Sequence, residues 1–347
     1  MRIKFLVGSV LLLIGGYSFF WYSLANKAEK TTLDWIENSE SRLGGIKAFV
    51  GDVTVSGFPY RIVVEASSFN AEIPAGRIAQ DNVSINVPAV SVVFQPWEPN
   101  HAIILTDYFD AVVGSLREPD LNISFDGVRS SIILDPETMS LNNLSAVFDK
   151  IDWYPNSVRE EVNVSYMEEA EFHLRRTTGI PDDQQGYDLP VNRAIYFKAN
   201  NARIRELSNT ILGEDSDSLK VEALLHANEQ PDYSKAALAK WRDDGGTLSI
   251  RTFEYGTSSS SINLEGDVTL DESFKPLGAF DANITGLANM FMKLAENEEL
   301  PELTRSLLRS QAQNESLNGE VPLSISMQNG QLYFGPIMLM ELSPVIE

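Results

Sequence analysis

The hydrophobic positions of the chain follow two different periods. Residues 5–25 read FLVGSVLLLIGGYSFFWYSLA and carry no charged side chain. At about 1.5 Å per residue, a helix of this length reaches about 30 Å, the thickness of the hydrocarbon core of a bilayer. From Val53 onward, apolar and polar residues alternate over most of the chain, as in strands with one covered face. The pattern predicts one membrane-spanning helix followed by a mainly β chain.

The flanks of the apolar segment predict how it is oriented. Arg2 and Lys4 precede it, which favours a cytoplasmic N-terminus and an exported remainder. Because the apolar core of a secretory signal is only about 7–15 residues long, an uncleaved anchor over residues 1–27 is favoured. Cleavage after Ala25, in the sequence Ser-Leu-Ala, is the alternative. The anchor side chains expected to face lipid or the membrane interface are Phe5, Leu11, Leu12, Leu13, Phe19, Phe20, Trp21 and Tyr22.

The chain beyond the anchor divides into three predicted regions. Leu33, Ile36 and Leu43 have helical spacing and precede a Gly-Gly pair, which predicts a short amphipathic helix. A stretch rich in Gly, Pro and Asp at 179–190 predicts a loop and a boundary. The regions are a juxtamembrane helix (28–45), an N-terminal β-rich region (46–190) and a C-terminal β-rich region with helices (191–347).

Turn-forming residues separate the predicted strands of the first β-rich region. They are Gly57–Pro59, Pro74–Gly76, Pro88, Gln95–Asn100, Asp126–Gly127 and Asp135–Pro136. In the second region, helical spacing predicts helices at 200–213, at 231–246 and from Leu287 to about Ser310. Asn329–Gly330 predicts a tight hairpin.

The sequence Gly57-Phe58-Pro59-Tyr60 interrupts a strand-like pattern. Proline cannot donate to a sheet ladder, so Pro59 must lie at an edge, a strand start or a bulge. The strands at 48–56 and 60–66 are therefore predicted to be separate or bent at 57–59. We expect Phe58 to turn into the apolar interior.

The predicted fold class is mainly β with a few helices, forming a large curved antiparallel sheet or a sandwich. An apolar sheet face must be covered, and physical grounds favour the sandwich, in which two sheets cover each other. The alternative is a partly open sheet whose apolar face lines a groove. Candidate groove-lining sets are Val53/Val55, Ile62/Val64, Val83/Ile85/Val87 and Val90/Val92/Phe94.

Composition limits the chemistry of the protein. The chain has no cysteine, which excludes disulfides, thiolate metal sites and a cysteine nucleophile. Its formal net charge of −22, with Arg175–Arg176 as the main basic pair, argues against binding nucleic acid.

Motifs of catalysis are missing as well. His101, His173 and His226 are dispersed, so structural roles are favoured over metal binding or base catalysis. The acidic runs at 214–217 and 168–171 fit solvated surface better than a calcium loop or a paired-acid site. We expect a non-enzymatic protein without cofactor or metal.

Several sequence elements together resemble the bacterial domain of unknown function 2125 family. They are VSGFPYRI (55–62), QPWEPNH (95–101), AKWRDDGGTLSI (239–250) and VPLSISMQNGQLYFGPI (321–337). Their characteristic residues are Gly57, Phe58, Pro59, Tyr60, Pro96, Trp97, Pro99, Asn100, His101, Trp241, Gly245 and Gly246. The resemblance implies a Gram-negative envelope protein and no catalytic residue. Residues 262–294 are also similar to the repeat of AsmA-like envelope proteins, which are β-groove proteins implicated in phospholipid traffic.

These features give one hypothesis and one alternative. The protein is expected to be anchored in the inner membrane, with its bulk in the periplasm, and to bind a phospholipid, an acyl chain or a hydrophobic envelope partner in an apolar β groove. The alternative is a scaffold or assembly factor that contacts envelope proteins through its edge strands.

Overall fold

The computed structural model divides into two compact units. It describes residues 2–42, 45–75, 81–115, 119–155, 164–177, 187, 189–208, 210, 212–229, 234–296, 302–314, 317, 319–335 and 337–346. The N-terminal unit comprises Met1–Ala146 and Pro155–Ser157, and the C-terminal unit comprises Val147–Tyr154 and Val158–Glu347. The predicted loop at 179–190 lies largely outside the described residues.

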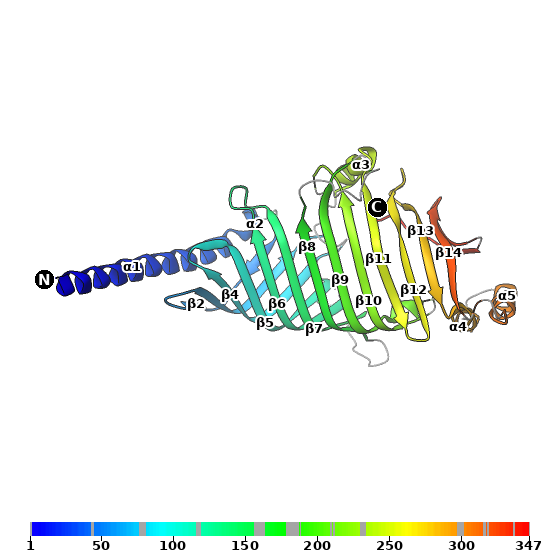
Figure 1. The fold of residues 1–347 in the computed structure, drawn as a ribbon, viewed down its shortest axis with the longest axis horizontal. Coiled ribbons are helices and arrows are strands. Elements are labelled where there is room, and N and C mark those ends of the chain that lie inside the picture. Colours follow the sequence, from blue (N-terminus) through cyan, green and yellow to red (C-terminus); the bar gives the residue numbers. More distant parts are fainter. Residues whose placement is uncertain are drawn as a thin grey trace. The chain divides into compact units, whose positions relative to one another are not determined.

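The N-terminal unit begins with a long helix, α1 (Arg2–Glu37). Over Lys4–Glu37 this helix is long and apolar enough to cross a membrane. It has no proline or glycine between Gly16 and Glu37, so nothing in the sequence stops it near residue 27. The segment expected to form a separate juxtamembrane helix is therefore mostly the continuation of α1, followed by the short α2 (Ser39–Arg42). The N-terminal part of α1 extends away from the strands of its unit (Figure 1).

Antiparallel strands form the rest of the N-terminal unit. They are β1 (Lys47–Phe49), β2 (Val53–Ser56), β3 (Ile62–Ile73), β4 (Val83–Gln95), β5 (Glu98–Gly114), β6 (Pro119–Leu134) and β7 (Leu141–Pro155), the last of which both units share. β1 and β2 both pair with β3, and β3 to β6 pair in sequence order. The chain bends between β2 and β3, as the Gly-Phe-Pro sequence predicts.

The residues that point to the covered face of this sheet have even numbers at one end of the strands and odd numbers at the other end. On β5, Ile103 and Leu105 are exposed, whereas farther along the strand Ala111 is buried. Ser68 on β3 and Gly127 on β6, with φ values of 50° and 60°, lie where the change occurs. A left-handed residue interrupts the extended geometry, so the alternation resumes one residue out of phase. The predictions that Asp126–Gly127 form a turn and that Pro88 separates two strands are wrong, because β6 and β4 run through them.

The C-terminal unit is also an antiparallel sheet in sequence order. Its strands after β7 are β8 (Ser165–Arg176), β9 (Val191–Arg203), β10 (Asp215–His226), β11 (Thr247–Thr257), β12 (Ser260–Leu270), β13 (Pro276–Thr285), β14 (Glu320–Gln328), β15 (Gln331–Phe334) and β16 (Ile337–Glu341). Asn329 and Gly330, with φ values of 55° and 69°, form the predicted two-residue hairpin turn between β14 and β15.

The fold class is confirmed: the protein is mainly β, with a large open antiparallel sheet and one long apolar N-terminal helix. Fifteen of the described strands follow one another along this sheet, and β2 is attached to β3. The sandwich favoured on physical grounds is therefore wrong. The alternation of apolar and polar residues is the same in both architectures, because it records only that each strand has one covered face.

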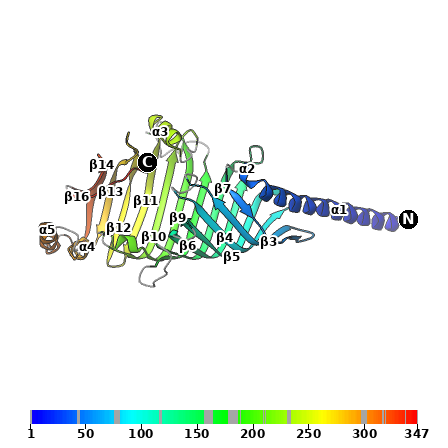
Figure 2. The same ribbon diagram turned by 180° about the vertical axis from the view of Figure 1, so that it is seen from behind.

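Among the described residues of the C-terminal unit, three α-helices accompany the strands. They are α3 (Lys235–Asp243), α4 (Leu287–Leu294) and α5 (Glu302–Ala312). α3 lies at one end of the strands, and α4 and α5 lie at the other (Figures 1 and 2). The three correspond to two of the predicted helical segments. The third prediction, a helix at 200–213, is wrong: β9 extends to Arg203 and the described part continues as a 3₁₀ turn over Arg205–Leu207.

The main core of the C-terminal unit lies where α4 meets the sheet. Leu287, Met290, Phe291 and Leu294 are all buried on one face of α4. They pack in a cluster with buried sheet residues such as Ile284, which is 0% exposed. Burying each such side chain contributes about 1.5–3 kcal/mol, so this end of the sheet is firmly covered.

Candidate functional site

The second half of α1 packs on the sheet of the N-terminal unit. Trp21 and Ala25 form a buried cluster with Ile62 and Val64 of β3. The partly buried residues around this cluster are Leu24, Ala28, Val53, Val55, Val92 and Phe94. Most of the predicted groove-lining residues in this part of the sheet therefore cover α1 and are not free to line a groove. In the remaining predicted set, Val83 and Val87 are buried at 5% and 8% exposure.

The turn between β2 and β3 is attached to the same helix. The Tyr17 hydroxyl donates to the Pro59 oxygen at 2.5 Å, and Trp21 Nε1 donates to the Arg61 oxygen at 3.1 Å. The Phe58–Pro59 peptide bond is cis. Phe58 contacts Trp21 edge to face, with ring centroids 5.4 Å apart, and remains 46% exposed. The expectation that Phe58 points into the interior of the sheet is therefore wrong, because its partners are aromatic rings on α1.

The Pro-Trp-Glu-Pro-Asn-His sequence forms the tight turn between β4 and β5 and the start of β5. Trp97 lies at its tip and is 63% exposed. Asn100 Nδ2 donates to the Leu134 oxygen at 3.1 Å, and His101 Nε2 lies 3.0 Å from Ser131 Oγ. Pro96 and Pro99 flank the tip on either side. Asn100 and His101 thus attach β5 to β6, and their role in the structure is architectural.

Trp241, Gly245 and Gly246 close α3 against the sheet. Trp241 Nε1 donates to the backbone oxygen of His226 at 2.9 Å. Gly245 has φ of 87° directly after the helix, which favours glycine. A Cβ atom on Gly246 would overlap the Trp241 indole nitrogen. The glycine pair is therefore explained by helix termination and by the space that the indole occupies.

One face of the C-terminal sheet carries mainly apolar side chains from β8 to β14, with Arg176 and Arg193 as the next pair beyond Leu174 and Ile195. The pairings place Phe197 beside Phe172 and Val221, and Phe253 beside Val221 and Leu264, all on this face. The partly exposed side chains of this face are Phe172, Leu174, Ile195, Phe197, Val221, Leu225, Leu248, Ile250, Phe253, Leu264, Val268, Leu323 and Met327. We call this set the apolar face.

Coverage of the apolar face is uneven. At the end nearest α4, Tyr255 and Ile262 are buried at 2% and 4% exposure. Farther along the same strands, Ile250 and Val268 keep partial exposure. Among the described helices, α4 packs on the buried end, and α5 packs chiefly on α4. The sheet therefore offers a partly open apolar surface beside a closed core.

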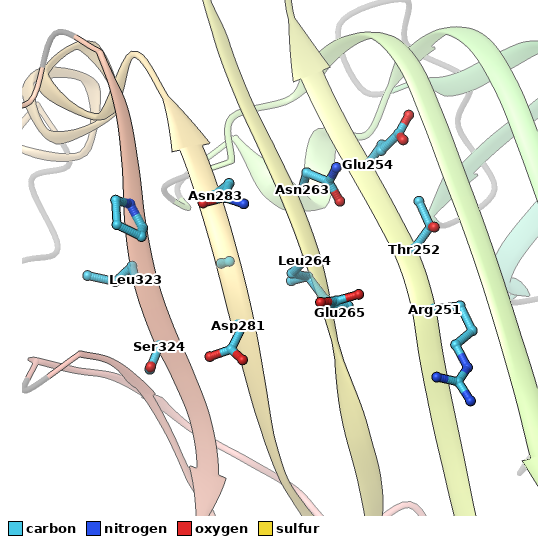
Figure 3. A pocket seen from close by; sticks show the side chains of 12 residues that line it. Arg251, Thr252, Glu254, Asn263, Leu264, Glu265, Asp281, Asn283, Leu323 and Ser324 are labelled. Atoms are coloured by element: carbon cyan, nitrogen blue, oxygen red, sulfur yellow. The ribbon is translucent and has the colours of Figure 1, made fainter. Parts of the chain in front are cut away.

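The opposite face of the same strands is polar and hollowed. A hollow of about 530 Å³ lies over β11 to β14, and a second of about 440 Å³ adjoins it. Glu265 and Asp281 lie directly opposite each other on β12 and β13 (Figure 3). Asn263 and Asn283 form the next pair on the same face. Among the described lining residues Arg251 supplies the positive charge and Glu254 adds a third acid. A net negative hollow disfavours anionic headgroups and phosphates.

A hydrogen-bonded cluster lies at the edge of the second hollow. Asp267 Oδ1 accepts from the Tyr187 hydroxyl at 2.8 Å and from the Ser249 hydroxyl at 2.5 Å. The Tyr187 ring stacks on His226 with centroids 3.9 Å apart. Burial raises the pKa of Tyr187, and the contact of its hydroxyl with the Ser249 hydroxyl acts in the opposite direction.

His226 is a buried neutral base within this cluster. It is 0% exposed, and its Nδ1 lies 3.1 Å from the Leu189 oxygen, so Nδ1 carries the proton. Burial lowers the pKa of His226. No partner among the described residues reaches its Nε2. Because Tyr187 and Ser249 share Asp267 and neither is hydrogen-bonded to this imidazole, the cluster lacks a nucleophile paired with a base.

The other candidate side chains from the sequence lie outside this cluster. His173 lies on the exposed side of β8, 3.7 Å from Glu171. Glu214 and Asp215 form ion pairs with Arg205 and Arg203, at 2.7 and 2.9 Å. Within the described residues no group of three His, Cys, Asp or Glu side chains could hold a metal ion.

Sequence reasoning did not find the apolar face of β8 to β14 or the cluster around Tyr187. The apolar alternation of Phe253, Tyr255, Ile262 and Leu264 was visible, but alternation does not tell which strands remain uncovered. Tyr187 lies in a segment that resembles a loop, and its partners are 62 and 80 residues away, so no local pattern connects them.

The fold and the candidate site define a β-sheet protein with one N-terminal helix long and apolar enough to span a membrane. The chain belongs to a family described as uncharacterized proteins conserved in bacteria (DUF2125), whose model matches residues 21–342. The match begins at Trp21, which is buried against the sheet. No curated protein and no solved structure matches the chain.

Proposed function

We propose that the protein is held in the bacterial inner membrane by α1, with a cytoplasmic N-terminus and a periplasmic bulk, and that its apolar face binds the acyl chains of phospholipids. The observation that carries the proposal is the partial exposure of that face along β8 to β14. Monomeric soluble proteins rarely leave a contiguous apolar surface of more than a few hundred Å² uncovered. An acyl chain is unbranched and apolar, so it matches a long surface of Phe, Leu, Ile and Val side chains.

The distribution of charge supports a ligand that contributes its apolar part. The polar side of the same strands carries Glu265, Asp267 and Asp281, which repel phosphate. On the apolar side, residues 221, 253 and 264 offer no hydrogen-bonding side chain. The proposed complex therefore keeps the headgroup in water at the rim and the chain on the sheet.

Retention of α1 is part of the proposal. Ala25 is 6% exposed and packs with Trp21 against β3. Cleavage after Ala25 would remove Trp21 and both hydrogen bonds to the Gly57–Arg61 turn, leaving Ile62 and Val64 uncovered. Intact mass of the protein purified from membranes should match the full chain. A mature N-terminus at Asn26 would contradict retention.

We also propose that the protein is not an enzyme. The polar cluster of Tyr187, Ser249 and Asp267 is hydrogen-bonded internally, and neither hydroxyl is hydrogen-bonded to the neutral His226 that stacks on Tyr187. If Ser249→Ala abolished a measurable hydrolytic activity of the purified protein, this part of the proposal would fail.

Lipid binding can be tested with two variants on neighbouring residues of β9. Phe197→Gln places an amide on the apolar face, whereas Lys198→Gln changes the adjacent side chain on the opposite face. Full-length protein is extracted in detergent, and its lipid content is measured by native mass spectrometry. We expect phospholipid to copurify with wild type and with Lys198→Gln, and to be strongly reduced in Phe197→Gln. Wild-type protein without lipid, together with no exchange of a fluorescent phospholipid, would reject the proposal.

Orientation can be measured in the same protein because it has no cysteine. A single cysteine in place of exposed Ser258, between β11 and β12, should react with a membrane-impermeant maleimide in spheroplasts. Protection until the membrane is lysed would place the sheet in the cytoplasm.

A second candidate function is strand addition by a protein partner. β16 (Ile337–Glu341) pairs with β15 and ends the described sheet, so it presents an edge. An edge strand can accept a strand from another chain through backbone hydrogen bonds. Stoichiometric crosslinking of one envelope protein to residues 337–341, with no lipid recovered, would favour this function over lipid binding.

A further inference from the structure

Three turns of the N-terminal unit lie at the same end of its strands, and we call this end of the strands the turn edge. Ile62 pairs with Phe94, Phe94 with Ala102, and Ala102 with Ile132. The turns next to these four residues are Gly57–Arg61, Pro96–Trp97 and Asp135–Ser140. Since neighbouring strands alternate in direction, all three turns lie just beyond this row of paired residues, at one end of the strands.

Each of these turns carries a large apolar side chain in solvent. Tyr60 is 75% exposed, Trp97 is 63% exposed and Met139 is 61% exposed, with Phe58 at 46% beside Tyr60. Side chains of this size are uncommon at turn tips, where small and polar residues dominate. Aromatic residues with one polar atom are enriched where hydrocarbon meets water.

The membrane helix fixes which environment the turn edge meets. Tyr17 and Trp21 of α1 donate to Pro59 and Arg61, so the first turn is attached to α1 at the level of these two residues. From Phe5 to Phe20 the side chains of α1 do not pack in the core of the unit. This segment is about 24 Å long at 1.5 Å per residue. A hydrocarbon core of about 30 Å is longer than that.

We infer that the turn edge, formed by Phe58, Tyr60, Trp97 and Met139, rests in the interfacial region of the bilayer that α1 enters. Because the segment from Phe5 to Phe20 is shorter than the hydrocarbon core is thick, the turn attached to its end lies at the depth of the headgroups and upper acyl chains. Because the strands are paired in sequence order, the turns at 96–97 and 135–140 lie beside the first turn, along the same membrane surface. Arg61, Glu98 and Glu137 are exposed at the turn edge, so the contact is shallow and these charges stay in water. The occupant of the surface is lipid, and it fixes the tilt of the unit on the membrane.

The inference rests on membrane insertion of α1 and does not depend on a ligand at the apolar face. Its test uses single cysteines in the cysteine-free full chain, each carrying a nitroxide label. The labelled variants are Tyr60→Cys, Trp97→Cys and Met139→Cys. Leu12→Cys, in the exposed apolar part of α1, marks the membrane interior. Asp81→Cys, an exposed residue just before β4 at the opposite end of the strands, marks water.

The proteins are reconstituted in vesicles of phosphatidylcholine and phosphatidylglycerol, and collision of each label with oxygen and with a water-soluble nickel chelate is measured. We expect the oxygen-to-nickel ratio at residues 60, 97 and 139 to lie between the ratios at 12 and 81. Ratios at 97 and 139 equal to that at 81 would overturn the inference, even with residue 60 immersed beside α1. A water-like ratio at residue 12 would overturn the membrane anchor and the inference together, whereas loss of lipid copurification alone would overturn only the proposed ligand.

Discussion

Trp21 Nε1 donates to the backbone oxygen of Arg61 across 3.1 Å, and the two residues are 40 positions apart in the sequence. The indole is 3% exposed and packs on Ile62 and Val64. The helix expected to serve only as a membrane anchor is therefore also an element of the folded N-terminal unit. Displacing α1 from the sheet should therefore destabilise β1, β2 and β3.

Replacing Trp21 with alanine should destabilise the N-terminal unit. The substitution removes a buried aromatic side chain and its hydrogen bond, at a cost of about 3–5 kcal/mol. Urea unfolding of the full chain in mild detergent, followed by limited proteolysis near residues 57–61, measures the change. Phe19→Ala is the matched control, because Phe19 is 79% exposed on the same helix. Equal effects of the two variants would show that Trp21 does not join α1 to the sheet.

Phe58 and Trp21 should be energetically coupled. Phe58 is 46% exposed, so Phe58→Ala is expected to cost about 1 kcal/mol, well below the cost of removing a fully buried phenylalanine. A double-mutant cycle with Trp21→Leu should give a coupling of about 0.5–1.5 kcal/mol, the usual range for an edge-to-face aromatic pair. Tyr60→Ala, at a neighbouring residue that is 75% exposed, should leave stability in detergent nearly unchanged. Coupling near zero would mean that the ring contact contributes nothing.

The sequence predicted those elements whose signal is local. The Asn329–Gly330 hairpin follows from two adjacent residues that tolerate positive φ, and α4 follows from apolar residues at helical spacing. The bend at Gly57–Pro59 follows from the missing amide hydrogen of proline. The helix expected at 200–213 failed because residues 200–203 pair with β10, a tertiary constraint that outweighs helical spacing.

The site depends on features that alternation does not encode. Pro88 lies between two apolar sets of opposite parity, Val83/Ile85/Val87 and Val90/Val92/Phe94, and a break was the natural interpretation. In the structure one strand continues and the phase changes within it, beside Ser68 on β3. Likewise, Ile262 and Phe253 each lie between two polar residues. Ile262 is buried in the cluster that contains the α4 side chains and Phe253 stays partly exposed, because coverage depends on elements distant in the sequence.

Gly246→Ala should destabilise the attachment of α3. An added methyl group would overlap the Trp241 indole, which donates to the His226 oxygen, so either the helix or the indole must shift. Overpacking of this kind costs about 1–3 kcal/mol. Thermal unfolding of the full chain, monitored by near-ultraviolet circular dichroism, measures it. Gly319→Ala is the control, because nothing lies within 4 Å of the added atom, and a similar loss there would contradict the explanation.

Stability should fall in mild acid because of His226. Burial holds the pKa of this imidazole below its ordinary value of 6.5, the nearby Arg251 charge adds to the effect, and the Leu189 and Asp267 oxygens oppose it. As the pH drops below about 6.5, the unfolded histidine binds a proton at a higher pH than the native one. The unfolded state then holds more protons, so the free energy of unfolding decreases as the pH falls.

The His226→Gln variant isolates this contribution. Glutamine keeps a donor for the Leu189 oxygen but does not titrate, so the variant should lose less stability than wild type between about pH 6.5 and pH 5. Urea unfolding of the full chain at a series of pH values gives the two slopes. His173→Gln is the matched control, because it makes the same substitution at a side chain on β8 that is 40% exposed. If His226→Gln kept the wild-type slope, the imidazole would be protonated equally in the folded and unfolded states, and the neutral base assigned beside Tyr187 would be wrong.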